Sequence, residues 1–505
     1  MNTEKFKSLL LTVLVVTSIV LTQRVWFNSP LQIISSEASY LGEKEAELLQ
    51  AREQVIRPKQ IITGFGGGPE NSHYSILTPP DLERFWLEMQ VILKDHFLSE
   101  PTVQSLSMEE YQHIRAGRSI EMHFAKGFPT ALLSTLFDQQ ENRIAATLSE
   151  IESILVPARY QGSIYINDGS GALYQFNLSR QEFPHWLDPG ELLDSIPANS
   201  YVKYYPLFSY VGNETLLPLT HQLNKPLLFV ESEVDASSNE QMNQWAGQFF
   251  NENFDFVKTI QETGGTRIYM YGYGQQEVRI NNRGRLEYSA ETGSQTTSSV
   301  VKALDTALLF LADNAGLNTD LVLREVLLLE QDSLRGYQFG FGYTLRDVPV
   351  ALARNQQPLE IEVFGNNVRS YRAFIRRPMS LPEVLPESGI ISPHRLIEDN
   401  FNQLLQDLAG ERTQTTAVPV PVEPAADLEE ANTSEVQEPE SPDVVGEDLL
   451  RAIRKIELIY LDREETHRRQ MMIPVWRITI DQRVYDFDAH EGTRLQTLTL
   501  SRRDV

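Results

Sequence analysis

The sequence of 505 residues contains no cysteine. Disulfide bridges, thiolate zinc sites, iron–sulfur ligation and cysteine nucleophiles are therefore excluded. Basic residues are also few relative to acids, with 44 Lys and Arg against 69 Asp and Glu, which gives a net charge of −25. Such a charge argues against nucleic acid as a partner and against an external surface that adheres to anionic lipid. With 41% hydrophobic residues, the chain can still bury substantial cores.

Long hydrophobic runs are lacking too, with one exception near the N-terminus. Residues 8–27 read SLLLTVLVVTSIVLTQRVWF, in which only Gln23 and Arg24 are strongly polar. About 20 helical residues cross the hydrocarbon core of a bilayer. A cleavable signal would end in a small-x-small site, but the nearest such pair, Ser36 and Ala38, lies well beyond the run. We therefore expect an uncleaved transmembrane anchor in contact with the lipid bilayer.

The charges beside this run predict its orientation. Lys5 and Lys7 lie in the short tail of residues 1–7, and the positive-inside rule keeps such a tail in the cytoplasm. The chain is then a single-pass protein of the cell membrane, extracytoplasmic from about residue 28 onward. Hydroxyl side chains within the anchor can bond across to a partner helix, at about 0.6 kcal/mol per contact. These hydroxyl groups can equally form hydrogen bonds with the backbone of their own helix. The residues that carry them are Thr12, Thr17, Ser18 and Thr22.

Catalytic signatures are missing as well. The sequence has no G-x-S-x-G nucleophile elbow and no H-E-x-x-H zinc motif. His467 lies close to Glu464 and Glu465 and could be written as an acid/base pair, but between two expected strands these residues are more simply solvated charges. The sequence therefore predicts no catalytic residue, no cofactor and no metal ligand.

Two short segments, DFDAHEG and GFGGGPE, could bind a ligand or could be ordinary structural turns and loops. The run DFDAHEG places Asp486, Asp488, His490 and Glu491 close together, and such oxygen-rich clusters can hold a hard cation. The spacing of a calcium loop is absent, however, and the run favours a strand that enters a turn at Gly492. The run GFGGGPE lacks the lysine and hydroxyl of a phosphate-binding loop. We expect a mobile loop at its glycines, which are Gly64, Gly66, Gly67 and Gly68.

The part beyond the anchor is predicted to begin with a stalk and an N-terminal α+β domain. Residues 28–60 are expected to form the stalk, because residues 37–60 are rich in charged, helix-favouring residues, and residues 61–220 alternate helical with strand patterns. Apolar residues recur at helical spacing after Pro79-Pro80-Asp81, which predicts a helix to about residue 98. Strand patterns on either side of Asn167-Asp168-Gly169 predict a hairpin.

A second α+β domain with an antiparallel sheet is predicted over residues 221–380. Helical patterns cover residues 243–265, ending at a glycine pair, and residues 294–316, again ending at a glycine. Strand patterns lie between and after these helices, and one pair forms a hairpin about Gly365-Asn366-Asn367.

The third predicted domain spans residues 390–505. It opens with a helix over residues 395–410 and ends with three strand patterns after residue 453. Between them, residues 413–446 hold five prolines, eight acids and no Lys or Arg. A segment of this composition cannot bury enough apolar surface to offset its ordering entropy, so we expect disorder there.

The N-terminal anchor, several of these strand patterns and the helix between the first two of them together resemble the YycH family, also called WalH. They occur in the family's order, which is the specific part of the likeness: YMYGYGQQEVRINNRGRLEY, GYQFGFGYTLRDVPV, IEVFGNNVRSYRAFIR, IELIYL, PVWRI and YDFDAHEG. The closest correspondences are Gly336-Tyr337 with Pro349-Val350, and Pro474-Val475-Trp476 with Phe487-Asp488-Ala489 and Gly492. The acidic residues 413–446 depart from the family pattern.

The resemblance implies a function that is not enzymatic. YycH proteins are single-pass regulators of the YycG (WalK) sensor histidine kinase, with an elongated extracytoplasmic part of three domains. They act with YycI, a related membrane protein whose fold is similar to the last two domains of YycH. The resemblance thus implies that a sensor kinase and a YycI-like protein are partners, and that membrane helices pack beside one another to set the activity of the kinase.

Two other classes of function stay open at this stage. A cell-wall enzyme held by the anchor would need a catalytic constellation in a cleft, and the sequence shows none. A ligand-binding sensor would need a deep apolar pocket with convergent polar groups.

Overall fold

The computed structural model describes residues 46–67, 74–139, 141–179, 188–196, 203–206, 208, 211–213, 215–218, 223, 225–291, 296–297, 299–315, 321–331, 333–354, 356–381, 384–386, 389–415, 442–464 and 468–500. The chain divides into two units, residues 1–54 and 55–505. In the first unit, residues 46–54 are helical. Among the described residues, no helix is long and apolar enough to cross a membrane. The expected anchor over residues 8–27 lies outside them.

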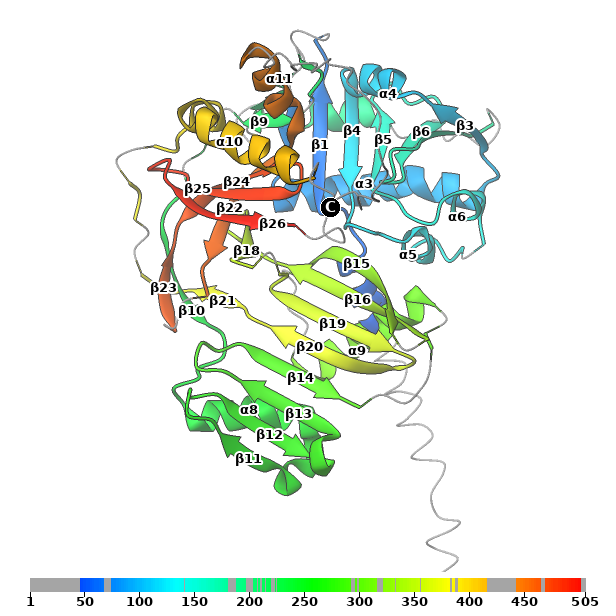
Figure 1. Ribbon diagram of the computed structural model, residues 1–505. Helices are drawn as coiled ribbons and strands as arrows, with labels where there is room; N and C mark the ends of the chain where they lie inside the picture. Colours follow the sequence, from blue (N-terminus) through cyan, green and yellow to red (C-terminus); the bar gives the residue numbers. More distant parts are fainter. Residues whose placement is uncertain are drawn as a thin grey trace, which may run out of the picture. The chain divides into compact units, whose positions relative to one another are not determined.

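The N-terminal part of the second unit forms a nine-stranded antiparallel sheet in the order β3-β7-β6-β5-β4-β1-β2-β8-β9 (Figure 1). Its strands are β1 (Gln60–Phe65), β2 (Tyr74–Ile76), β3 (Thr102–Leu106), β4 (Arg118–His123), β5 (Ser153–Pro157), β6 (Ser163–Asn167), β7 (Leu173–Asn177), β8 (Lys203–Pro206) and β9 (Leu216–Pro218). Its helices are α3 (Pro79–Leu98), α4 (Met108–Arg115), α5 (Thr130–Thr135), α6 (Arg143–Thr147) and α7 (Pro189–Asp194).

Helix α3 forms where the sequence predicts it, after two prolines that suit the first helical turn. Phe85, Met89 and Leu93 are fully buried along it, at the four-residue spacing of one helix face. The expected hairpin is also present, because β6 and β7 pair from Ser163 with Asn177 to Asn167 with Leu173.

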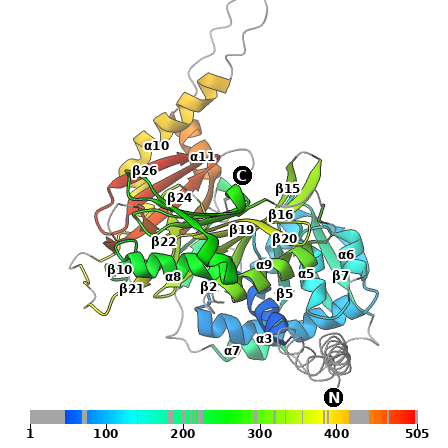
Figure 2. The same ribbon diagram turned by 90° about the horizontal axis from the view of Figure 1, so that it is seen from below.

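An eight-stranded antiparallel sheet follows in the order β11-β12-β13-β14-β20-β19-β16-β15. Its strands are β11 (Lys258–Gln261), β12 (Arg267–Tyr271), β13 (Gln276–Ile280), β14 (Leu286–Ala290), β15 (Val322–Gln331), β16 (Leu334–Gly342), β19 (Leu359–Phe364) and β20 (Asn367–Ala373). Helices α8 (Asn239–Phe250) and α9 (Val300–Asn314) lie against this sheet, and Figure 2 shows the same elements from below. Their aromatic contacts join Phe249 and Phe310 to Tyr288 and Tyr371 of the sheet.

The C-terminal strands form a six-stranded sheet in the order β17-β18-β22-β24-β25-β26, and a three-stranded sheet in the order β21-β10-β23. Their strands are β10 (Leu228–Ser232), β17 (Thr344–Leu345), β18 (Val348–Leu352), β21 (Arg376–Pro378), β22 (Ile453–Asp462), β23 (Arg469–Met472), β24 (Pro474–Ile480), β25 (Arg483–Asp488) and β26 (Arg494–Thr499). Helices α10 (Pro393–Thr415) and α11 (Pro442–Ala452) share a core with the six-stranded sheet, in which Leu404, Leu449, Trp476 and Phe487 are buried. Among the strands of the described residues, β18 and β22 are the only two that pair in parallel, so the expected α+β class with mainly antiparallel sheets is confirmed.

The sheets do not follow the successive domain ranges that the sequence analysis expected. Strand β18 lies within residues 221–380 but pairs with β22, and Phe208 and Leu217 belong to the core beneath α10. Residues late in the expected stalk are also part of a folded unit, since Val55 and Ile56 are buried and Gln60 begins β1. The local sequence predicts which segments can form a helix or a strand. It does not predict which distant strand pairs with a given strand to complete a sheet.

Two local expectations need correction. The helix expected over residues 243–265 is α-helical only to Phe250 and continues as a 3-10 helix over Asn251–Phe256. Lys258–Gln261 then form an edge strand, whose hairpin turn contains the glycine pair. The apolar residues of this segment fit neither the helical nor the strand spacing consistently, so the sequence did not show where helix changes to strand. The ends of the segment expected to be disordered are helical, because α10 continues to Thr415 and α11 begins at Pro442. Residues 416–441 lie outside the described part of the chain.

Candidate functional site

The residues proposed for partner packing are not among those described: Thr12, Thr17, Ser18 and Thr22. His467 and Glu465 are also outside the described residues, whereas Glu464 is described and forms an ion pair with Arg285.

The acidic run at the end of β25 has structural partners. Both carboxylate oxygens of Asp486 accept hydrogen bonds of 2.8 Å from Arg477, and both residues are buried. Asp488 accepts the backbone N–H groups of His490 at 2.8 Å and Glu491 at 3.0 Å, which closes the turn that the sequence predicted. Within the described part of the chain, no group of three His, Asp or Glu side chains could hold a metal ion.

The glycine-rich segment is only partly a loop. Gly64 lies inside β1 and pairs with Ser119 of β4, so the expectation of a loop is wrong at this residue. A Cβ atom at Gly64 would lie 2.8 Å from the carbonyl oxygen of Gly117, which explains the glycine by close backbone approach. Gly66 and Gly67 follow the strand with positive φ, and Gly68 lies outside the described residues.

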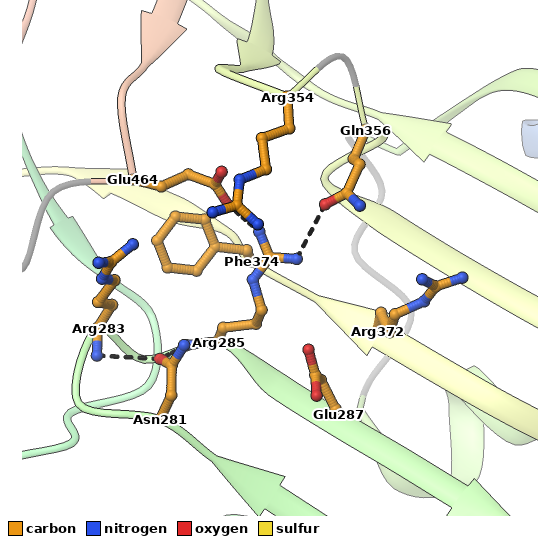
Figure 3. Close-up of a pocket in the computed structure, with 9 residues that line it drawn as sticks. All are labelled: Asn281, Arg283, Arg285, Glu287, Arg354, Gln356, Arg372, Phe374 and Glu464. Carbon is orange, nitrogen blue, oxygen red and sulfur yellow. Dashed lines mark hydrogen bonds and ion pairs between the residues drawn. The ribbon is translucent and has the colours of Figure 1, made fainter. Parts of the chain in front are cut away.

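A pocket that the sequence analysis missed lies beside β14 and β20 (Figure 3). It has a volume of about 350 Å³ and is lined by Asn281, Arg283, Arg285, Glu287, Arg354, Gln356, Arg372, Phe374 and Glu464. The residues come from the turn before β14, from β14 and β20, and from the segments that follow β18 and β22. Because they are scattered over nearly 200 positions of the sequence, no local motif could reveal them.

The turn between β13 and β14 positions two of the pocket arginines. The side-chain oxygen of Asn281 accepts the backbone N–H groups of Arg283 at 3.0 Å and Arg285 at 2.9 Å. Gly284 between them has φ of +88°, and a Cβ atom there would lie 2.5 Å from the carbonyl oxygen of Val234. The turn therefore requires both the asparagine side chain and the glycine.

Two of the four arginine side chains are held by acceptors of the protein. Arg285 forms an ion pair with Glu464, donates a 3.2 Å hydrogen bond to Gln356 and lies 5.4 Å from the ring centre of Phe374. One terminal nitrogen of the Arg372 guanidinium lies 3.1 Å from a carboxylate oxygen of Glu360 and 3.1 Å from a carboxylate oxygen of Glu362.

The other two guanidinium groups are uncommitted. In the part of the chain that the structure describes, neither Arg283 nor Arg354 has a side-chain hydrogen bond or an ion pair. Burial lowers the pKa of Arg285; the negative charges of Glu287 and Glu360 raise it, and the positive charges of Arg354 and Arg372 lower it. Four arginines and two glutamates give the lining a formal charge of +2, although the chain carries −25. The pocket is thus polar and cationic, unlike the apolar pocket that a sensor was expected to need.

Comparisons with known proteins identify relatives of the chain. Residues 4–177 match the family described as "YycH protein, N-terminal domain". The crystal structure of YycH from Bacillus subtilis is 12% identical, covers 89% of this chain and 97% of its own length, and superimposes with a TM-score of 0.47. The C-terminal domain of Bacillus megaterium YpeB is also 12% identical, covering 52% of this chain and 98% of its own, with a TM-score of 0.24. No curated protein matches the sequence.

Proposed function

We propose, from the match of residues 4–177 to the model of the YycH N-terminal domain, that the chain is a membrane-anchored regulator of a YycG (WalK)-type sensor histidine kinase. The match extends the resemblance to a region that precedes the strand motifs named in the sequence analysis. It also includes residues 8–27, the expected anchor. This match is the observation on which the proposal depends.

The proposed mechanism is regulation without catalysis. The anchor packs beside the membrane helices of the kinase through Thr12, Thr17, Ser18 and Thr22, while the extracytoplasmic part contacts a YycI-like protein. Interhelical hydrogen bonds average about 0.6 kcal/mol, so two or three of them supply a coupling free energy of about 1–2 kcal/mol. A coupling of this size changes an equilibrium between active and inactive kinase about fivefold or more.

Affinity purification tests the partners. The tagged full-length chain and a version that lacks residues 1–27 are purified from gently solubilised membranes. A sensor kinase or a YycI-like protein should be recovered with the full-length chain and be lost or depleted without the anchor. Recovery of neither partner with the full-length chain, at good yield, would contradict the proposal.

Substitutions within the anchor test the mechanism separately from folding. Replacing residues 8–27 by an unrelated transmembrane helix should leave the extracytoplasmic part folded but abolish regulation, measured as transcription from a kinase-dependent promoter. Thr17→Val and Thr22→Val remove hydroxyl groups with little change in shape, and should weaken regulation. Leu11→Ile, which removes no polar group, serves as the matched control. Unchanged kinase output in the helix swap would refute transmission through the anchor.

A further inference from the structure

We propose that the pocket lined by Arg283, Arg285, Arg354 and Arg372 is a binding site for a small ligand that carries a phosphate group. The inference goes beyond the proposed regulation of a kinase and does not depend on it. It rests on the arrangement of charges in the pocket rather than on the family resemblance.

The first support is the pair of uncommitted guanidinium groups. Arg283 and Arg354 line the pocket without a side-chain partner among the described residues. In Figure 3 the side chain of Arg354 extends toward Arg285 and Glu464, and its charge lowers the pKa of Arg285. Like charges brought together in a pocket repel one another, and a bound anion relieves that repulsion.

The second support is the match between the lining and a phosphate group. A guanidinium presents a planar fork of N–H donors that pairs with the oxygens of phosphate. Arg283 and Arg354 have no ion-pair partner among the described residues, and a phosphate monoester near neutral pH carries nearly the opposite of their combined charge. A volume of about 350 Å³ admits a small phosphate ester. A cation would be repelled by the arginines of the lining, and a wholly apolar ligand would leave the polar side chains of the pocket without partners.

The third support is the way the site is assembled. Asn281 fixes the backbone that carries Arg283 and Arg285, and Arg372 is held by two glutamates. Arg354 and Glu464 approach from the segments after β18 and β22, which belong to the six-stranded sheet. A phosphate held between these groups would therefore connect the eight-stranded to the six-stranded sheet. Such a ligand would give the sensor hypothesis a physical site, with a polar pocket in place of an apolar one.

Isothermal titration calorimetry with inorganic phosphate tests the site directly. The full-length chain in mild detergent is titrated at constant ionic strength, with sodium chloride as the blank. Phosphate should bind, and Arg354→Ala should weaken binding about tenfold, because a hydrogen bond to a charged group is lost. Arg283→Ala should also weaken it. Arg354 is exposed and has no side-chain partner in the described part of the chain, so its removal should leave the fold intact, as judged by circular dichroism.

A matched control separates a specific site from general attraction. Arg335→Ala removes one positive charge from β16 of the eight-stranded sheet, where the side chain is 65% exposed and lies outside the pocket. Its affinity for phosphate should equal that of the unmodified chain. The absence of binding to the unmodified chain, or an equal loss in the Arg335 and Arg354 variants, would overturn the proposal.

Two further probes identify the source of the phosphate group. Glycerol 3-phosphate represents a soluble monoester, and a short-chain phosphatidylglycerol represents a lipid headgroup. Tighter binding of the first, lost in Arg354→Ala, would support a soluble metabolite. Tighter binding of the second with the same loss would support a lipid headgroup. Failure of both probes to depend on Arg354 would contradict the site. None of these measurements involves the kinase, so their failure would leave the proposed regulatory function untouched.

Discussion

Breaking the buried ion pair between Arg376 and Asp462 should destabilise the junction of the three-stranded sheet with the six-stranded sheet. Both side chains are 0% exposed, and the Nε atom of Arg376 lies 2.9 Å from a carboxylate oxygen of Asp462. The other oxygen of Asp462 accepts the backbone N–H of Glu464 at 2.8 Å and the side-chain amide of Gln470 at 2.6 Å. Arg376 also donates a 2.9 Å hydrogen bond to the carbonyl oxygen of Arg468. The pair thus connects β21, β22 and the start of β23.

The substitution Asp462→Ala leaves the Arg376 guanidinium buried without its counter-charge. Removing one partner of a buried ion pair costs about 3–5 kcal/mol, because the remaining charge loses both hydration and compensation. The matched control is Glu330→Ala, which breaks the ion pair with Arg335 at the surface, where the side chains are 62% and 65% exposed. Exposed pairs contribute at most about 1 kcal/mol.

Hydrogen–deuterium exchange of the full-length chain measures this effect locally. Asp462→Ala should raise the exchange rate of peptides from β10, β21 and β23, whereas α3 and the nine-stranded sheet should change less. The double substitution Arg376→Met with Asp462→Leu removes both charges and should restore part of the protection, because apolar side chains of similar volume avoid the uncompensated charge. If Asp462→Ala and Glu330→Ala had equally small effects, the assigned role of the buried pair would be wrong.

Two other predictions concern the pH dependence of stability and a tight turn. His96 is buried beside the Tyr160 hydroxyl at 2.9 Å, and burial lowers its pKa from 6.5 to about 3. Between these pH values the unfolded chain binds a proton that the folded chain does not, so stability should fall as pH falls, by up to about 1.4 kcal/mol per pH unit. His96→Gln should flatten that fall in urea unfolding at pH 4 to 6. Gly284→Ala should lower the unfolding midpoint more than Gly171→Ala, because both have positive φ but only Gly284 would contact backbone, at 2.5 Å from Val234. Equal midpoints for the two glycine variants would refute close approach as the reason for Gly284.

Local sequence patterns were sufficient for most individual elements. The prolines before α3, the turn after β6 and the hairpin about Gly365 each act within a few residues, and each element is present in the structure. The prediction failed where the local pattern was ambiguous, as after Phe256, where helical structure is followed by an edge strand before the glycine pair. Gly64 was misjudged because a glycine in a strand and a glycine in a loop look alike without the neighbouring strand.

The sequence by itself determined the class of the protein: its lack of cysteine, its acidic charge, its single apolar run and the order of its helices and strands are properties of the chain. The tertiary structure decided which strands share a sheet and which charges meet. Strand β18 pairs with β22 more than 100 residues later, and Arg354, Arg285 and Glu464 line one pocket. The physical reason is that periodicity and turn residues act over short distances, whereas burial, ion pairing and pockets depend on contacts between segments whose separation along the chain leaves no local signal.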